Sequence, residues 1–215
     1  MRRRIELEGC IAGVGFASGD RFVIGLWRRG PLGPMNDVMW AQPDGKRILL
    51  APTKEAADFI GGIYDFDEVR VVDFRVTESA DRFNVSAGAV RVEAHGGARY
   101  RLFALRPRML RRSLLWVRVE DFLLRRAIGR LLLGGAEGVR AFGHTRSGIK
   151  EWYRVDSYRP MTAAHATVDG RDLGAMGPLS PRLGFGFSEF PRRPAIVACS
   201  PVLEGTFDNN HRRYG

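Results

Sequence analysis

Short runs in which apolar and polar residues alternate dominate the chain and predict β-strands. Side chains of a strand point to its two faces in turn, so each run predicts a strand with one apolar face. Three examples are Phe22, Ile24 and Leu26; Val72, Phe74 and Val76; and Leu183, Phe185 and Phe187. Gly184 and Gly186 occupy the other face of the last run, which predicts a bend or a close approach.

Turn residues between the runs predict hairpins with a defined register. Pro43, Asp44 and Gly45 suit a three-residue turn that pairs Gln42 with Lys46. The register that follows sets Trp40 opposite Ile48 and Val38 opposite Leu50.

Two further hairpins are predicted in the same way. Asp169 and Gly170 suit a two-residue type I′ turn, which sets Ala166 opposite Leu173. A loop of His95, Gly96 and Gly97 would set Val92 opposite Tyr100, Val90 opposite Leu102, and Glu93 opposite Arg99.

Two segments have helical rather than strand periodicity. Residues 53–63 predict a short packing helix that Thr53 caps. Residues 113–133 predict an amphipathic helix that packs Trp116, Leu124 and Ile128 on the sheet and exposes Arg118 and Arg125.

That longer helix carries a carboxylate on its apolar face and has an alternative. Glu120 requires a donor, for which an arginine from a strand is a candidate, because an unpaired buried carboxylate is costly. Alternatively, Leu115, Val117 and Val119 form a strand and a shorter helix runs from Asp121 to Leu133.

Together these elements predict an α+β, mainly antiparallel β fold, either barrel-like or a two-sheet sandwich of many short strands with two helices. We expect a single β-rich domain over residues 1–205 and a flexible C-terminal tail over residues 206–215. The sequence carries no signal for the oligomeric state.

Composition restricts the location of the chain. Glu6 and Glu8 interrupt the segment after the N-terminal arginines, and no stretch has the roughly 18 apolar residues of a membrane span. We therefore expect no transmembrane segment and a cytoplasmic location. Cys10 and Cys199 then predict reduced thiols, with a single bridge as the alternative.

The formal net charge of +10 favours anionic partners without identifying one. Pairs of arginines recur along the chain, but no nucleic-acid-binding motif accompanies them, so we expect no sequence-specific nucleic acid binding. The defects in the apolar face of residues 113–133 argue against peripheral membrane contact. Docking of a basic protein on an acidic membrane or nucleic acid is retained as an alternative function.

Motifs for catalysis and for cofactors are weak. The glycine-rich segment 13–20 precedes a strand, not the helix that a phosphate-binding loop requires, and predicts a hairpin turn. The four histidines are too widely spaced for a local metal site, so we expect no metal and no cofactor.

Two sets of residues are candidates for function. Trp27, Arg28, Arg29 and Trp40 are candidate ligand-binding residues, because basic loops beside an apolar β interior suit an apolar or amphipathic anionic ligand. The alternative is an enzyme in which His144 and a carboxylate, Glu151 or Asp156, perform acid-base catalysis.

Overall fold

The computed structural model describes residues 2–79, 81–100, 110, 113–125 and 137–207. These residues form two β-sheets and two helices. Almost all strand pairs are antiparallel, and the exception is the parallel pair of β5 with β6. The predicted α+β, mainly antiparallel class is confirmed.

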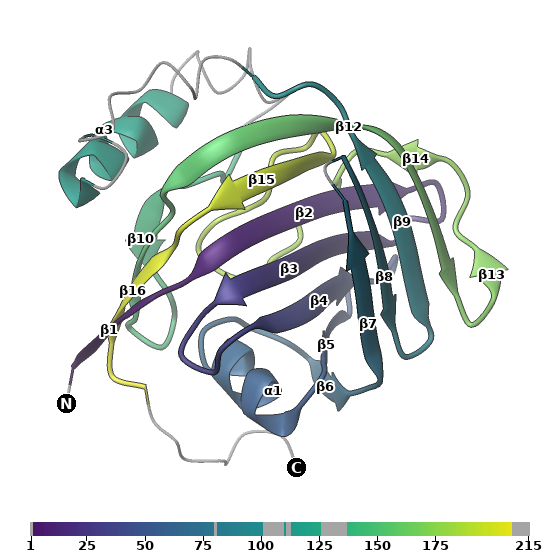
Figure 1. The fold of residues 1–215 in the computed structure, drawn as a ribbon, viewed down its shortest axis with the longest axis horizontal. Coiled ribbons are helices and arrows are strands. Elements are labelled where there is room, and N and C mark those ends of the chain that lie inside the picture. The colour runs from purple at the N-terminus through teal and green to yellow at the C-terminus, as the bar shows by residue number, and fades with distance from the viewer. Residues whose placement is uncertain (1, 80, 101–109, 111–112, 126–136, 208–215) are drawn as a thin grey trace.

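The larger sheet is a strongly curled half-barrel (Figure 1). Its strands, in the order in which they pair, are β6 (Glu68–Val71), β5 (Arg47–Ala51), β4 (Met35–Ala41), β3 (Arg21–Arg29), β2 (Glu8–Phe16), β15 (Ala195–Cys199), β12 (Val155–Val168), β9 (Val90–Gly96), β8 (Arg82–Ala87) and β7 (Phe74–Glu78). Two short strands pair beside this path, β13 (Arg171–Asp172) with β12 and β14 (Met176–Gly177) with β2.

The curl brings the two ends of this sheet together. β6 and β7 are the terminal strands of the pairing order, yet only Val72 and Asp73 connect them. Two residues span less than about 11 Å even when they are extended with their flanking bonds, so the edges must approach each other. β12 makes the turn between the two arms, since its first half pairs with β15, its second half pairs with β9, and a bulge lies between Met161 and Ala163.

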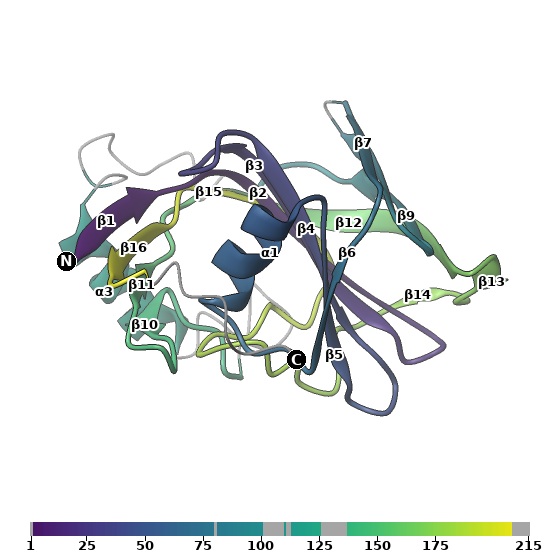
Figure 2. The ribbon, with the colours of Figure 1, turned by 90° about the horizontal axis from the view of Figure 1, so that it is seen from below.

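The smaller sheet lies beside one end of the half-barrel (Figure 2). Its order is β1 (Arg3–Glu6), β16 (Val202–Gly205), β11 (Lys150–Trp152) and β10 (Phe142–His144). The buried Arg154 connects it to the chain beside β15, because its guanidinium donates to Glu6 Oε2 at 3.1 Å and to the Ser200 carbonyl at 2.9 Å.

Strands β2 to β5 are buried on both faces and therefore separate two apolar cores. The inner core lies between the two arms of the half-barrel and includes Ala12, Val14, Phe22, Ile24, Val38, Trp40, Ile48, Leu50, Phe83, Val85, Val90, Val92 and Ala166. The outer core lies on the opposite face and includes Val23, Trp27, Met39, Leu49, Ile60, Ile63, Leu183, Phe185 and Val197. Alternate residues of one strand thus enter different cores.

Two of the predicted hairpins are confirmed to the residue. The Gln42 N–H donates to the Lys46 carbonyl at 2.9 Å, and Trp40 lies opposite Ile48. At the other turn, Asp169 and Gly170 both have positive φ, 50° and 77°, as a type I′ turn requires. The glycine-rich segment 13–20 contains the end of β2 as far as Phe16, and only its residues 17–20 form the turn that leads into β3.

The hairpin predicted at His95 to Gly97 is wrong. β9 pairs with β8 and β12, so Val92 lies opposite Val85 and Ala166, while the Tyr100 N–H donates to the Tyr158 carbonyl. The predicted partner Leu102 lies outside the described residues. An alternating pattern fixes which face of a strand is apolar but not which neighbour it pairs with, and β8 offers the same pattern across a tighter turn at Gly88.

The strand predicted at Leu183 to Phe187 is also absent, because this segment is irregular. Gly184 has φ +71°, which is incompatible with a strand. Leu183 and Phe185 are nevertheless buried in the outer core, so their spacing reports burial and not strand pairing.

Both helices begin at a capping residue. Thr53 caps α1 (Lys54–Gly61) by accepting from the Ala56 N–H, as predicted. Ser113 caps α3 (Leu114–Leu124), so the alternative of a strand at Leu115 to Val119 is wrong. The rest of the predicted helix, including Ile128, is outside the described residues, apart from the C-cap Arg125.

The faces of α3 differ in part from the prediction. Val117 and Asp121 are its buried residues, and Leu115 is 72% exposed. The indole of Trp116 in the same helix donates to Glu120 at 3.0 Å, so the helix itself supplies a donor for this carboxylate. The Arg118 guanidinium lies 4.7 Å from the centre of the Phe142 ring.

The remaining sequence predictions concern the cysteines, the tail and membrane spans. Cys10 and Cys199 are free thiols, so the alternative of a bridge is wrong. Phe207, within the predicted tail, stacks on Phe59 of α1 at 6.1 Å, and residues 208–215 lie outside the described residues. Neither described helix has the length and hydrophobicity to cross a bilayer.

The turn at Asp169 and Gly170 provides a test of the fold. Gly170→Ala should lower the free energy of unfolding by about 1 to 2 kcal/mol, because a side chain at positive φ is strained. The control Asp169→Gly relieves the same strain and should not destabilise the protein. Denaturant unfolding measures both; an equal loss in the two variants would contradict the assigned turn.

Candidate functional site

A cavity of about 410 Å³ lies in the outer core. The outer face of β2, β3, β4 and β15 forms one wall, and α1, α3 and the segment 183–191 form the opposite wall. None of the described residues that line it belongs to the inner core, which lies between the arms of the half-barrel. The cavity is therefore outside the curl and not in the barrel interior.

The lining is mostly apolar and rich in aromatic side chains. Seven of the described lining residues are aromatic: Trp27, Tyr64, Trp116, Tyr153, Tyr158, Phe185 and Phe190. Aliphatic side chains such as Ile11, Val23 and Val197 fill the spaces between them along the sheet. Such a surface suits an apolar molecule, with the few polar groups determining its orientation.

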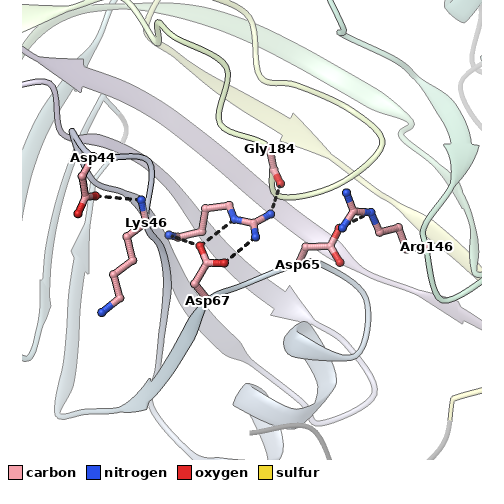
Figure 3. Close-up of polar contacts among 7 residues, drawn as sticks. Asp44, Lys46, Asp65, Asp67, Arg146 and Gly184 are labelled. Atoms are coloured by element: carbon pink, nitrogen blue, oxygen red, sulfur yellow. Dashed lines mark hydrogen bonds and ion pairs between the residues drawn. The ribbon is translucent and has the colours of Figure 1, made fainter.

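The segment 178–191, which we call the cover segment, is fastened to the sheet at several points. The Arg47 guanidinium forms a bidentate salt bridge with the Asp67 carboxylate, at 3.0 and 2.7 Å. It also donates to the Gly184 carbonyl at 2.9 Å. In Figure 3, dashed lines join Asp67 and Gly184 to the same unlabelled side chain, which is that of Arg47. The Asp65 N–H also donates to the Phe185 carbonyl at 2.7 Å.

A carboxylate within the cover segment holds its shape. Glu189 accepts from the Leu183 N–H at 2.8 Å and from the Gly184 N–H at 3.1 Å. The backbone of Arg140 is attached in turn, because Ser188 Oγ accepts from its N–H at 3.0 Å and donates to its carbonyl at 2.9 Å. These contacts fix an irregular backbone that no sheet hydrogen bonds support.

Asp37 is a carboxylate in the cavity wall. It is 1% exposed, and Trp27 Nε1 donates to its Oδ1 at 3.0 Å. Burial raises the pKa of Asp37 to about 7, although the bond from Trp27 opposes this. Among the described residues, its Oδ2 has no hydrogen-bond partner.

Gly25 makes the contact between Asp37 and Trp27 possible. It lies opposite Asp37 in the β3–β4 register. A Cβ atom at this position would lie 2.6 Å from Trp27 Nε1 and closer still to Asp37 Oδ1. Only glycine leaves room for the indole to reach the carboxylate.

A second buried carboxyl group, Glu151, lies behind two tyrosines of the lining. Tyr64 donates its hydroxyl to Glu151 Oε1 at 2.6 Å and lies 2.8 Å from the Tyr153 hydroxyl. Glu151 is 1% exposed, and burial raises its pKa to about 7. Burial raises the pKa of both tyrosines well above the ordinary value, so they stay neutral donors.

The structure separates the predicted ligand-binding residues. Trp27 lines the cavity, whereas Trp40 lies in the inner core and donates to Asp20 Oδ1 at 2.8 Å. Arg28 and Arg29 are exposed and contact Glu78 and Glu8, at 2.9 and 3.4 Å. Neither arginine is part of the lining.

The residues predicted for acid-base catalysis do not come together. Glu151 lies opposite Gly143 in the β10–β11 register, so its neighbour His144 points to the other face of the strand pair. His144 and Asp156 are both exposed, and Asp156 accepts from Ser200 Oγ at 3.1 Å. Glu151 is the member of this set that is buried beside the cavity.

Asp37 and Tyr64 line the cavity but are not among the residues predicted from the sequence. The signal for Asp37 is an acidic residue in the mostly apolar strand β4, opposite a glycine in β3. Tyr64 follows α1 and reaches Glu151 across 87 positions of sequence, a distance that no local pattern reveals.

Comparisons with known proteins do not assign the chain to a family. No family model and no curated protein matches it. The chain is similar to the crystal structure of acetoacetate decarboxylase from Legionella pneumophila, at 9% identity over 94% of this chain and 84% of that one, with a TM-score of 0.36. A TM-score of this size does not establish a common fold, so no site is carried over. Among the described residues, no three or more His, Cys, Asp or Glu side chains are arranged to hold a metal ion.

The raised pKa of Glu151 predicts that the stability of the folded protein depends on pH. In the unfolded chain this carboxyl loses its proton near pH 4.5, whereas in the folded protein it keeps the proton up to about pH 7. The folded state thus binds more protons between these values, so its stability falls as the pH rises through them. Relative to Glu151→Gln, the wild type should lose about 2 kcal/mol of unfolding free energy between pH 5 and pH 8.

Urea unfolding of both proteins across this pH range measures the difference. Asp156→Asn, which changes an exposed carboxylate, is the control and should follow the wild-type profile. A constant difference between wild type and Glu151→Gln at every pH would contradict the assignment.

Proposed function

We propose that the protein binds a small, largely apolar molecule in the outer-core cavity. The observation that carries this proposal is a cavity of about 410 Å³ whose wall holds seven aromatic side chains. This volume is in the range of roughly 300 to 1,000 Å³ that is usual for small-molecule sites. A solid core of the inner type would serve stability better, because unfilled apolar space costs contacts.

The way the cover segment is held supports a preformed site. The segment is hydrogen-bonded to Arg47 and Asp65, and the Glu189 carboxylate accepts from the backbone of the segment itself. These bonds fix one wall of the cavity before a ligand binds. A preformed site loses less conformational entropy on binding than a loop that must order itself. The sequence predicts a ligand with an anionic end that Arg28 and Arg29 would bind. Both arginines lie outside the lining, so only the apolar character of the predicted ligand is proposed.

A second candidate function is acid-base catalysis on the bound molecule. Glu151 favours it, because its pKa is about 7 and the Tyr64 hydroxyl connects it with the cavity. A general acid or base works best when its pKa is near the working pH. The pair would be Glu151 and Tyr64, in place of His144.

Deuterium exchange tests the catalytic candidate. Cyclohexanone in heavy water should exchange the protons beside its carbonyl faster with wild-type protein, and Glu151→Gln should reduce this acceleration by about a hundredfold. Nuclear magnetic resonance follows the exchange, with Asp156→Asn as the control. Exchange at the rate of the protein-free buffer would contradict catalysis of this kind while leaving ligand binding untouched.

Filling the cavity tests the binding proposal itself. N-phenyl-1-naphthylamine, a neutral dye that fluoresces in apolar surroundings, should bind the wild type in the micromolar range. Val23→Phe should weaken this binding at least about tenfold, because the added ring occupies the cavity next to Trp27. Val23→Ile, which adds one methylene group, should keep most of the binding.

A matched substitution on the other face of the sheet completes this test. Val38→Phe places the same ring in the inner core and should lower the free energy of unfolding by about 1 to 3 kcal/mol. Val23→Phe should cost clearly less, because the cavity accepts the ring. Absence of saturable dye binding to the folded wild type, together with equal destabilisation by both phenylalanines, would overturn the proposed function.

A further inference from the structure

The described part of the cavity wall carries more acidic than basic side chains, whereas the whole chain is basic. Of the described residues that line the cavity, Asp37, Glu120 and Glu189 carry carboxyl groups and Arg140 carries a guanidinium. The whole chain, in contrast, has a formal net charge of +10. An acidic cavity in a basic protein favours a cationic group over the anionic ligands that the rest of the surface attracts.

The three carboxylates differ in how their oxygens are used. Glu189 accepts two backbone N–H groups of the cover segment, and Glu120 accepts the indole N–H of Trp116. Asp37 is 1% exposed and lines the cavity, and its Oδ2 has no hydrogen-bond partner among the described residues. A buried carboxylate oxygen without a donor is costly, so this atom is where a ligand gains most by supplying one.

We propose that the ligand is an apolar amine, whose ammonium group donates to Asp37 Oδ2 while its hydrocarbon part lies among the aromatic side chains of the cavity. This inference rests on the proposed function and names the class of ligand. An ammonium group supplies both a donor and a compensating charge, whereas an alcohol supplies the donor alone.

An amine and an alcohol are distinguished by how their affinity for the cavity depends on pH. The pKa of Asp37 is raised to about 7, so its carboxyl is mostly neutral at pH 6 and mostly charged at pH 8. An alkylammonium ion keeps its charge over this range. Binding should therefore strengthen about tenfold from pH 6 to pH 8, in proportion to the charged fraction of Asp37.

Other titratable groups face the same cavity and belong in this account. They are Tyr64, Glu120, Arg140, Tyr153, Tyr158 and Glu189. Burial keeps the three tyrosines neutral over this range, because it raises the pKa of each. Glu151, with a pKa of about 7, lies behind Tyr64 and Tyr153, so Glu151→Gln measures its share of the pH dependence.

Calorimetry with a matched pair of probes tests the inference on the intact chain. Cyclohexylmethylamine should bind at pH 8 at least about tenfold more tightly than cyclohexylmethanol. Asp37→Asn, which retains an oxygen for the Trp27 indole, should remove this preference and leave the binding of the alcohol within about threefold. Asp156→Asn, which changes an exposed carboxylate, should keep the preference for the amine.

A measurement on the wild type keeps the test independent of any variant. At pH 6, binding of the amine should release close to one proton, seen as a heat that depends on the ionisation enthalpy of the buffer, and the alcohol should release none. Equal affinity for amine and alcohol, or no proton release, would overturn the amine assignment while dye binding would still support the proposed function. Failure of the amine, the alcohol and the dye alike would overturn both.

Discussion

Burial of β2 to β5 on both faces is the constraint on which the rest of the structure depends. The first seven residues of β3, Arg21 to Trp27, are all buried, so this strand has no face for water. A sheet of this kind must be covered twice. The other arm of the curled sheet provides the first cover, and α1, the cover segment and the smaller sheet provide the second.

The two covers differ in how they can fill space. In the inner core, strands pack on strands with side chains at a regular spacing, so apolar residues such as Phe22 and Val85 interdigitate. In the outer core, helix ends and an irregular segment face the sheet, and their side chains cannot match its spacing everywhere. The cavity occupies the resulting space, and polar groups such as Asp37 and Tyr64 lie at its wall. Fold and candidate site thus share a cause.

Local patterns predicted those parts of the structure that local forces determine. Turn residues such as Gly45 and Gly170 fixed two hairpins, and Thr53 fixed the start of α1, because each acts within a few residues of sequence. Strand partners depend on distant segments, so the predicted pairing of β9 at His95 and the predicted strand around Phe185 are both wrong. The candidate site shows the same limit, since Trp27 was identified but Asp37, Tyr64 and the burial of Glu151 arise only when several elements pack together.

The central claim is that the outer core, and not the interior of the half-barrel, holds an apolar ligand. Crystals soaked with a bromine-labelled cyclohexylmethylamine test it most directly, because anomalous scattering locates the bromine without reference to the fold. The account predicts bromine among Trp27, Tyr64 and Phe185, with the amine nitrogen within hydrogen-bond distance of Asp37 Oδ2. Bromine between the arms of the half-barrel, beside Phe22 or Trp40, or an outer core filled by protein side chains, would contradict it.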